Sequence, residues 1–184
     1  MQYELNTPCT AADLAPLKAG DTVLLSGVVY TARDQAHRRM TEALEKGELL
    51  PFDLTGSAIY YVGPTPERPG QVIGSAGPTT SGRMDAMSPR LLDLGNKIMI
   101  GKGKRDDAVK AAVVRNGAVY LAALGGAGAP MAKSVQPLEL SAWPDLGCEA
   151  VRRLIVKDMP LTVILDAHGG DLYQSGPAAY LEAK

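Results

Sequence analysis

Apolar runs of strand length alternate with segments of helical periodicity, and this alternation constrains the fold more than any other feature of the sequence. The apolar runs are residues 22–30, 58–62, 71–75, 97–100, 118–124 and 161–165. Helical patterns cover residues 33–46, 88–94, 106–116 and 147–156. Such alternation predicts a mixed α/β fold. Neither a change of composition nor an internal repeat divides the chain, so we expect one domain over residues 1–184.

A turn rich in small and hydroxylated residues follows the apolar run at 71–75. Gly77-Pro78 is a strong turn signal, and Thr79, Thr80 and Arg83 come directly after it. Hydroxyl groups beside a guanidinium, with little bulk around them, suit a small carboxylate ligand. For this segment taken alone, a polar loop without a ligand is the alternative.

A second cation, Arg33, follows the apolar run at 22–30. Thr31 and Asp34 have a spacing close to that of a capping box, which puts Arg33 in the first turn of a helix. Positive charge is unfavourable there unless an anion binds at the helix start. The alternative is that Arg33 reaches solvent or a nearby acidic side chain. Asp34 and Asp85 are expected to serve as pairing or capping groups.

The third cation, Lys102, stands between Gly101 and Gly103. Neither glycine has a Cβ, so a ligand can approach the backbone closely. A phosphate-binding loop is excluded, because its glycines are spaced differently and Ser or Thr follows its lysine. Lys104 and Arg105 are expected to form a solvated helix start.

Arg33, Arg83 and Lys102 therefore each follow a strand-like run. Ligands of open α/β sheets bind at the carboxyl ends of the strands, so we expect these three cations to converge on one site. Three cations suit a dicarboxylate, and bidentate arginine contacts fix its orientation.

Five motifs in this order resemble a known family: TARDQAH (31–37), YYVGP (60–64), GSAGPTTSGRMD (74–85), IGKGKR (100–105) and LGCEAVRRLIVKDMP (146–160). From about Leu5 to Tyr173 the chain is similar to the beta subunit, or C-terminal domain, of iron–sulfur-dependent class I fumarases and of the similar L-tartrate dehydratases. The sequence of residues 149–173 is more similar to that of fumarases than to that of tartrate dehydratases. The resemblance implies the swivelling β/β/α fold that is also found in the mobile domain of aconitases.

The same resemblance implies a hydro-lyase, which reversibly hydrates fumarate to L-malate. A separate alpha subunit would hold a [4Fe–4S] cluster with one open iron for the leaving hydroxyl, and this chain would be inactive without that partner. Arg33, Arg83 and Lys102 would hold the substrate carboxylates. Thr80 would add a hydrogen bond, and Thr79 would take the C3 proton with the help of nearby cations and of a partner carboxylate. A tartrate dehydratase subunit and a non-catalytic module for small anions are the alternatives.

Two cysteines, Cys9 and Cys148, are too few for an iron–sulfur cluster, which takes three or four thiolates. Cys148 is expected to be a small core residue at a helix start, and Cys9 to lie in a terminal turn. We expect no disulfide between them in a reducing compartment. The two histidines offer too few ligands for a metal site, so His37 is expected to be structural and His168 to lie in a turn with a backbone partner.

The composition excludes several kinds of partner. A net charge of −1 with one Trp and one Phe offers neither a basic surface nor a stacking platform for nucleic acid. No apolar run approaches the roughly 20 residues that span a bilayer, and residues 1–7 lack the features of a signal peptide. We therefore expect a cytoplasmic protein, and the family resemblance implies a hetero-oligomer. The glycine-rich segment 124–130 lacks the third glycine of a dinucleotide-binding motif and is expected to be a close-packed turn facing a partner subunit.

Overall fold

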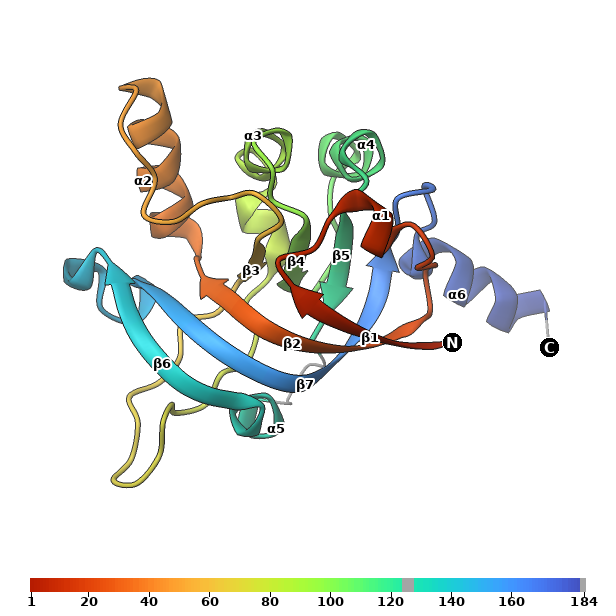
Figure 1. Ribbon diagram of the computed structural model, residues 1–184. Helices are drawn as coiled ribbons and strands as arrows, with labels where there is room; N and C mark the ends of the chain where they lie inside the picture. Colours follow the sequence, from red (N-terminus) through yellow and green to blue (C-terminus); the bar gives the residue numbers. More distant parts are fainter. Residues whose placement is uncertain (124–127, 183–184) are drawn as a thin grey trace.

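Within residues 1–123 and 128–182, which the computed structural model describes, seven strands form one continuous sheet (Figure 1). The strands are β1 (Gln2–Thr7), β2 (Thr22–Thr31), β3 (Ala58–Tyr60), β4 (Ile98–Gly101), β5 (Val119–Ala122), β6 (Val135–Ala142) and β7 (Val151–Leu165). The helices are α1 (Ala11–Leu14), α2 (Asp34–Glu45), α3 (Ser88–Asp93), α4 (Asp107–Asn116), α5 (Gly128–Lys133) and α6 (Leu172–Glu182), with two 3-10 helices, η1 (Ser81–Met84) and η2 (Pro144–Glu149).

The long strand β7 closes this sheet into a barrel-like wall. Strands β2, β3, β4 and β5 pair in parallel in this order, and β7 runs antiparallel to both β5 and β2. Because β7 has 15 residues, it pairs with β2 along one edge and with β6 and then β5 along the other. Strand β1 lies parallel to β2.

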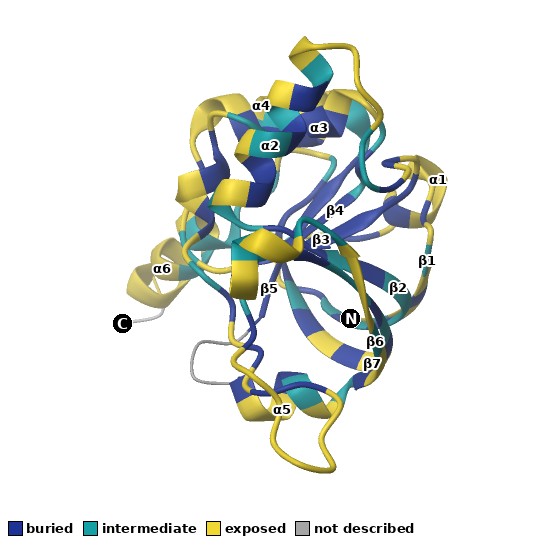
Figure 2. Cartoon of the chain, turned by 90° about the vertical axis from the view of Figure 1, so that its left-hand side faces the viewer, coloured by how far each residue is buried: buried dark blue, intermediate teal, exposed yellow. Residues whose placement is uncertain are grey.

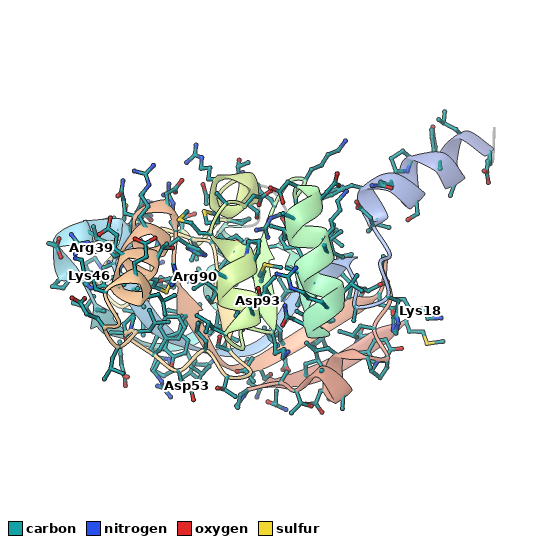
Figure 3. The ribbon with its side chains drawn as sticks, turned by 90° about the horizontal axis from the view of Figure 1, so that it is seen from above. Lys18, Arg39, Lys46, Asp53, Arg90 and Asp93 are labelled. Carbon is teal, nitrogen blue, oxygen red and sulfur yellow. The ribbon has the colours of Figure 1, made fainter. Side chains whose placement is uncertain are left out.

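Side chains of the parallel strands alternate between two apolar clusters, as the two-residue period of a strand requires. Ile98 and Ile100 belong to the cluster that joins residues from all seven described strands, whereas Met99 between them joins the cluster beneath the helices. Helices α2, α3 and α4 cover this second cluster, and their outer faces carry charges such as Arg39 and Asp93 (Figure 3). Figure 2 shows the central strands β3, β4 and β5 as buried, and every residue of these three strands is buried.

The α/β class is confirmed, and most of the local predictions match the observed elements. Strands β2, β3, β4 and β5 lie within predicted apolar runs or extend them by one residue, and helices α2, α3 and α4 lie within predicted helical segments. In each case the local pattern and the tertiary packing favour the same structure. The sequence did not predict β1, β6, α1, α5 or α6.

The predicted helix at residues 147–156 is wrong. Residues 144–149 form η2, and residues 151–156 belong to β7. Val151 and Leu154 are spaced as on a helix face, but this stretch pairs with β2 on one edge and with β6 on the other. Strand pairing on both edges overrides the short helical pattern.

The predicted strand at residues 71–75 is also wrong, because this stretch belongs to a loop, in which Gln71 and Val72 are exposed and Ile73 is buried in the core. Gly74 packs against the loop's other arm so closely that a Cβ there would lie 2.3 Å from the carbonyl oxygen of Thr65. The backbone therefore turns back on itself. Residues 124–127 of the glycine-rich segment lie outside the described residues, and the described part begins helix α5.

Candidate functional site

The predicted site residues lie at the carboxyl ends of the parallel strands β2, β3 and β4. Arg33 follows β2, and Lys102 follows β4. The segment 78–80 does not extend a strand of its own. It forms isolated bridges from Pro78 to Val62, beyond β3, and from Thr80 to Lys102. The threonine segment is therefore placed between the ends of β3 and β4.

Backbone hydrogen bonds fix this arrangement. The amide of Thr79 donates to the carbonyl oxygen of Tyr61 at 2.8 Å, and the amide of Ser81 donates to the carbonyl oxygen of Lys102 at 2.9 Å. In return, the amide of Lys102 donates to the Ser81 hydroxyl at 3.0 Å. The fold thus brings Thr79, Thr80 and Lys102 together from stretches that are about twenty residues apart.

Arg83 and Lys102 are exposed, and within the described parts of the chain neither forms an ion pair. Arg83 lies in η1, whose N-cap is Thr80. Two cations without a carboxylate partner, next to two threonines, can bind an anion. The positive charges of Arg83 and Lys102 are therefore available to a bound anion.

Arg33 differs from these two cations, because its charge is already compensated. Its Nη2 lies 3.5 Å from Oδ2 of Asp34 and 3.4 Å from Oε1 of Glu149. The predicted capping box is wrong, since Arg33 itself is the N-cap of α2 and makes no side-chain cap. Thr31 belongs to β2, and its hydroxyl donates to the carbonyl oxygen of Ala150 at 3.1 Å.

Arg33 also packs directly against the segment that follows β3. A Cβ on Gly63 would lie 3.0 Å from Nη1 of Arg33. Because residues 61 and 62 contact the threonine segment, Arg33 and Thr79 flank the same short stretch of backbone. Convergence of all three cations on a single ligand is not measured by these contacts and stays a prediction.

A buried ion pair lies beneath the site. Arg105, predicted to be solvated, is fully buried, and its Nε donates to Oδ1 of Asp85 at 2.6 Å. The guanidinium also donates to the Ser88 hydroxyl at 2.9 Å and lies over the rings of Tyr61 and Tyr120. The prediction was wrong because the residues that bury Arg105 come from three other parts of the sequence.

Asp85 connects the two loops that carry the open cations. Its second oxygen, Oδ2, accepts from the backbone amide of Asp106 at 2.7 Å. Asp85 follows η1, which carries Arg83, and Arg105 lies three residues after Lys102. The expectation that Asp85 is a pairing group is therefore confirmed, and its partner is a buried charge.

Tyr120 of β5 supports the same loops from below. Its hydroxyl lies 2.9 Å from both the Ser81 hydroxyl and the carbonyl oxygen of Gly103. Burial raises the pKa of Tyr120, so its hydroxyl stays protonated and can donate. The amide of Gly103 donates to the hydroxyl of Tyr173 at 3.3 Å. None of these partners could be identified from the sequence, because no local pattern links them.

The cysteines and histidines do not fit a metal centre or a cluster. No group of three His, Cys, Asp or Glu side chains suited to a metal occurs in residues 1–123 and 128–182. Burial, with a smaller contribution from Asp13, raises the pKa of Cys9 to about 11, so its thiol stays protonated. Cys148 is exposed in η2, so its predicted place in the core is wrong. His168 has the predicted backbone partner, the carbonyl oxygen of Ala15 at 2.7 Å from Nε2.

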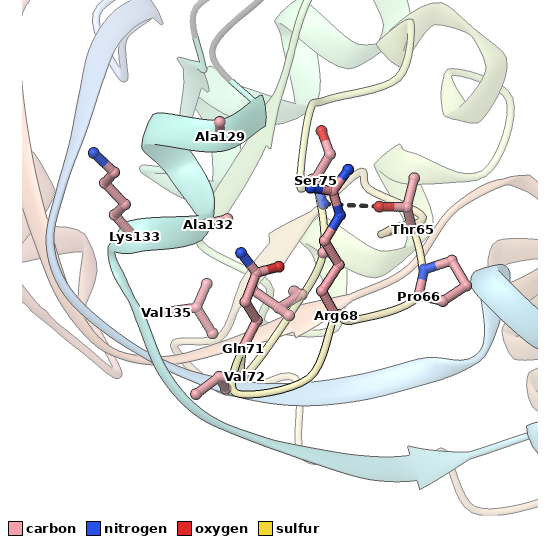
Figure 4. Close-up of a pocket in the computed structure, with 12 residues that line it drawn as sticks. Thr65, Pro66, Arg68, Gln71, Val72, Ser75, Ala129, Ala132, Lys133 and Val135 are labelled. Carbon is pink, nitrogen blue, oxygen red and sulfur yellow. Dashed lines mark hydrogen bonds between the residues drawn. The ribbon is translucent and has the colours of Figure 1, made fainter.

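A pocket of about 480 Å³ lies between the loop at 65–75 and helix α5 (Figure 4). Its polar lining includes Arg68, Gln71, Ser75 and Lys133. None of the five predicted site residues lines it, so this pocket is distinct from the candidate site. Among the described helices, none is both long and apolar enough to cross a membrane.

Comparison with known proteins gives a consistent set of similarities. Residues 1–176 match the family model described as the fumarase C-terminus. The aerobic class I fumarate hydratase of Escherichia coli (strain K12) is 35% identical over 178 residues, which cover 95% of this chain and 32% of that protein. Fumarate hydratase 2 of Leishmania major is 39% identical over 166 residues, 87% of this chain and 28% of that protein.

Subunits of similar length to this chain are also found. The putative L(+)-tartrate dehydratase subunit beta of Methanocaldococcus jannaschii is 41% identical over 180 residues, which cover 95% of this chain and 92% of the relative. The L(+)-tartrate dehydratase subunit beta of Escherichia coli (strain K12) is 31% identical over 189 residues and is covered to 92%. By contrast, the chain spans about a third of the length of the fumarate hydratases that it matches.

Proposed function

The chain belongs to the fumarase C-terminal family, and we propose that it is the beta subunit of a class I fumarate hydratase, which interconverts fumarate and L-malate. One observation carries the proposal. The threonine segment lies between the ends of β3 and β4, where Thr80 meets Lys102 and where Arg83 has no carboxylate partner within the described chain. Hydroxyls and uncompensated cations in this arrangement suit a small dicarboxylate. Residues 1–184 would act as one domain.

The roles follow from the chemistry of dehydration, which removes a weakly acidic C–H and expels hydroxide. Arg33, Arg83 and Lys102, which we call the cationic clamp, hold the substrate carboxylates. Thr80 donates a hydrogen bond to one of them. Thr79 takes the C3 proton, because nearby cations favour its alkoxide and stabilise the negative charge that develops on the adjacent carboxylate.

The leaving hydroxyl needs a Lewis acid, and the residues of this chain do not fit one. Two thiols, one buried with a raised pKa and one exposed, fall short of the three or four that a cluster takes. A [4Fe–4S] cluster on an alpha subunit would supply that chemistry when bound. We therefore propose a hetero-oligomer. Its place would be the cytoplasm, where a reducing environment keeps cysteines such as Cys9 and Cys148 as free thiols.

A tartrate dehydratase subunit is the second candidate. It is favoured by 41% identity to a putative L(+)-tartrate dehydratase beta subunit that this chain covers almost completely. The cationic clamp suits either substrate, because both carry two carboxylates. Turnover of fumarate, L-malate and L-tartrate by the assembled enzyme distinguishes the two. Preferential turnover of L-tartrate would contradict the fumarate assignment.

The open cations provide the test of the site. In the assembled enzyme, Arg83→Ala and Lys102→Ala should each lower kcat/KM roughly tenfold to a hundredfold, since each removes a charge-assisted hydrogen bond. Arg83→Lys should also lose activity, because a point charge cannot replace the guanidinium fork. Lys104→Ala, an exposed lysine of the same loop, is the matched control. Wild-type kcat/KM in both alanine variants would contradict the clamp.

A further inference from the structure

The segment at 147–152 contains a motif, Gly-Cys-Glu-Ala-Val-Arg, to which the proposed chemistry assigns no role. The segment forms a turn between η2 and β7. The Arg152 guanidinium donates to three carbonyl oxygens of this turn, those of Gly147 at 2.9 Å and of Cys148 and Ala150 at 3.2 Å each. The turn is also tied to β2, because the amide of Arg152 donates to the Thr31 hydroxyl at 2.9 Å.

This braced turn presents the Glu149 carboxylate to the start of α2. Its Oε2 accepts from the backbone amide of Gln35 at 3.0 Å, and its Oε1 lies 3.4 Å from Nη2 of Arg33. A carboxylate is favourable at a helix N-terminus. Glu149 thus provides the cap that Arg33, as the N-cap residue, does not make with its own side chain.

The same carboxylate restricts the Arg33 side chain. A long side chain loses conformational entropy when it is held in one geometry, so one that is ordered before the ligand arrives binds more tightly. The side chains of Arg33 and Glu149 are only 20% and 19% exposed. Arg33 is held by the carboxylates of Glu149 and Asp34, which lie 3.4 Å and 3.5 Å from Nη2, and by the backbone of Gly63, where a Cβ would lie 3.0 Å from Nη1.

We propose that Glu149 is a positioning residue, which orders Arg33 at the end of β3 for a substrate carboxylate. This inference rests on the proposed function, in which Arg33 belongs to the cationic clamp. It differs from a competitive arrangement, in which Glu149 would occupy the place of the substrate carboxylate. Positioning predicts weaker substrate binding without Glu149, and competition predicts tighter binding.

Steady-state kinetics of the assembled enzyme separate these two arrangements. Glu149→Gln keeps the size of the side chain and an acceptor for the Gln35 amide but removes the negative charge that faces Arg33. We expect the KM for fumarate to rise about tenfold, with kcat changing by less than about threefold. Asp145→Asn is the matched control, because Asp145 belongs to the same η2 and pairs with Arg39 of α2, away from the site. An unchanged or lower KM in Glu149→Gln would overturn the proposal.

Neighbouring arginines on β7 supply a second matched pair. Arg152 braces the turn, whereas Arg153 pairs with the exposed Glu139 of β6 at 3.5 Å. Arg152→Ala should therefore raise KM in the same direction as Glu149→Gln, and Arg153→Ala should leave KM unchanged. Equal effects of the two alanine substitutions would show that the turn does not act through its bracing.

A readout in the isolated chain keeps this proposal separate from the proposed function. In ¹⁵N spectra, the Nη2–H resonance of Arg33, the group that lies 3.4 Å from Glu149, should exchange slowly with solvent in the wild-type chain and should shift and exchange faster in Glu149→Gln. An unaffected resonance would overturn the positioning role, whatever the activity. If the wild-type pair of subunits does not hydrate fumarate, the proposed function fails, and this resonance alone decides whether Glu149 orders Arg33.

Discussion

At the scale of single residues, Thr79 and Thr80 are adjacent in sequence but have different proposed roles. Thr79→Val should abolish exchange of the C3 proton of malate, measured as deuterium wash-in from heavy water by the assembled enzyme. Loss of a general base lowers the rate of proton transfer on the order of 100- to 10,000-fold. Thr80→Val should retain the exchange with weaker binding and serves as the control. Near-normal exchange in Thr79→Val would place the base on the partner subunit.

His37 is a second residue whose behaviour follows from its surroundings. Its Nδ1 lies 3.1 Å from the carbonyl oxygen of Arg33, and its buried Nε2 has no hydrogen-bond partner within the described chain. Burial lowers the pKa of His37 to about 4, so the folded protein holds this ring neutral. The ring packs edge-on against Tyr61, in keeping with the structural role that its sequence predicts.

The neutral ring makes stability depend on pH. Above about pH 6.5 the ring is neutral in both states, and as the pH falls toward 4 the unfolded chain takes up the proton first. His37 should therefore lower the free energy of unfolding by on the order of 3 kcal/mol across this window. Urea unfolding of wild type and His37→Gln between about pH 7 and pH 4.5 checks the expectation. The same pH dependence in both proteins would contradict it.

At the scale of elements, the buried pair of Asp85 and Arg105 joins η1 to the loop before α4. Asp85→Asn leaves a buried guanidinium without its counter-charge, and we expect a loss of about 3–5 kcal/mol of stability. Adding Arg105→Met should restore much of this stability, because an apolar residue replaces the unpaired charge. The double variant should still have low kcat/KM, since the two loops are no longer tied together.

The matched control for this pair is Asp93→Asn on α3. Asp93 pairs with Arg115 of α4 at 2.7 Å, but both side chains are about half exposed. Such a surface pair contributes about 0–1 kcal/mol. Urea unfolding gives the free energy of unfolding of Asp85→Asn, of the double variant and of Asp93→Asn. A loss in Asp85→Asn no larger than that in Asp93→Asn would contradict a supporting role for the buried pair.

At the scale of the whole molecule, the proposed reaction needs groups that this chain does not supply. The isolated chain should be folded, colourless and inactive in fumarate hydration, because its thiols do not fit a cluster. Adding an alpha subunit with its cluster should produce activity. Absorbance, circular dichroism and a hydration assay on the chain alone and on the pair check this prediction. Clear hydration by the iron-free chain would contradict it.

The sequence by itself determined the α/β class, the family and the residues of the candidate site. Helices α2 and α4 could be predicted because helical periodicity is local, extending over a few turns. The turn residues Pro78, Thr79 and Thr80 could be identified for the same reason, since turn chemistry depends on neighbours in the sequence. The five motifs carried the family resemblance because they occur together and in order.

Only the tertiary structure decided how these pieces meet. Residues 151–156 have a helical pattern but form part of strand β7, because they pair with β2 along one edge and with β6 along the other. Burial made Arg105 a supporting residue rather than a solvated one, and packing brought Glu149 to the start of α2 from 114 residues away. Such contacts depend on the path of the whole backbone, and their energies come from burial and charge pairing between distant residues, which no local pattern encodes.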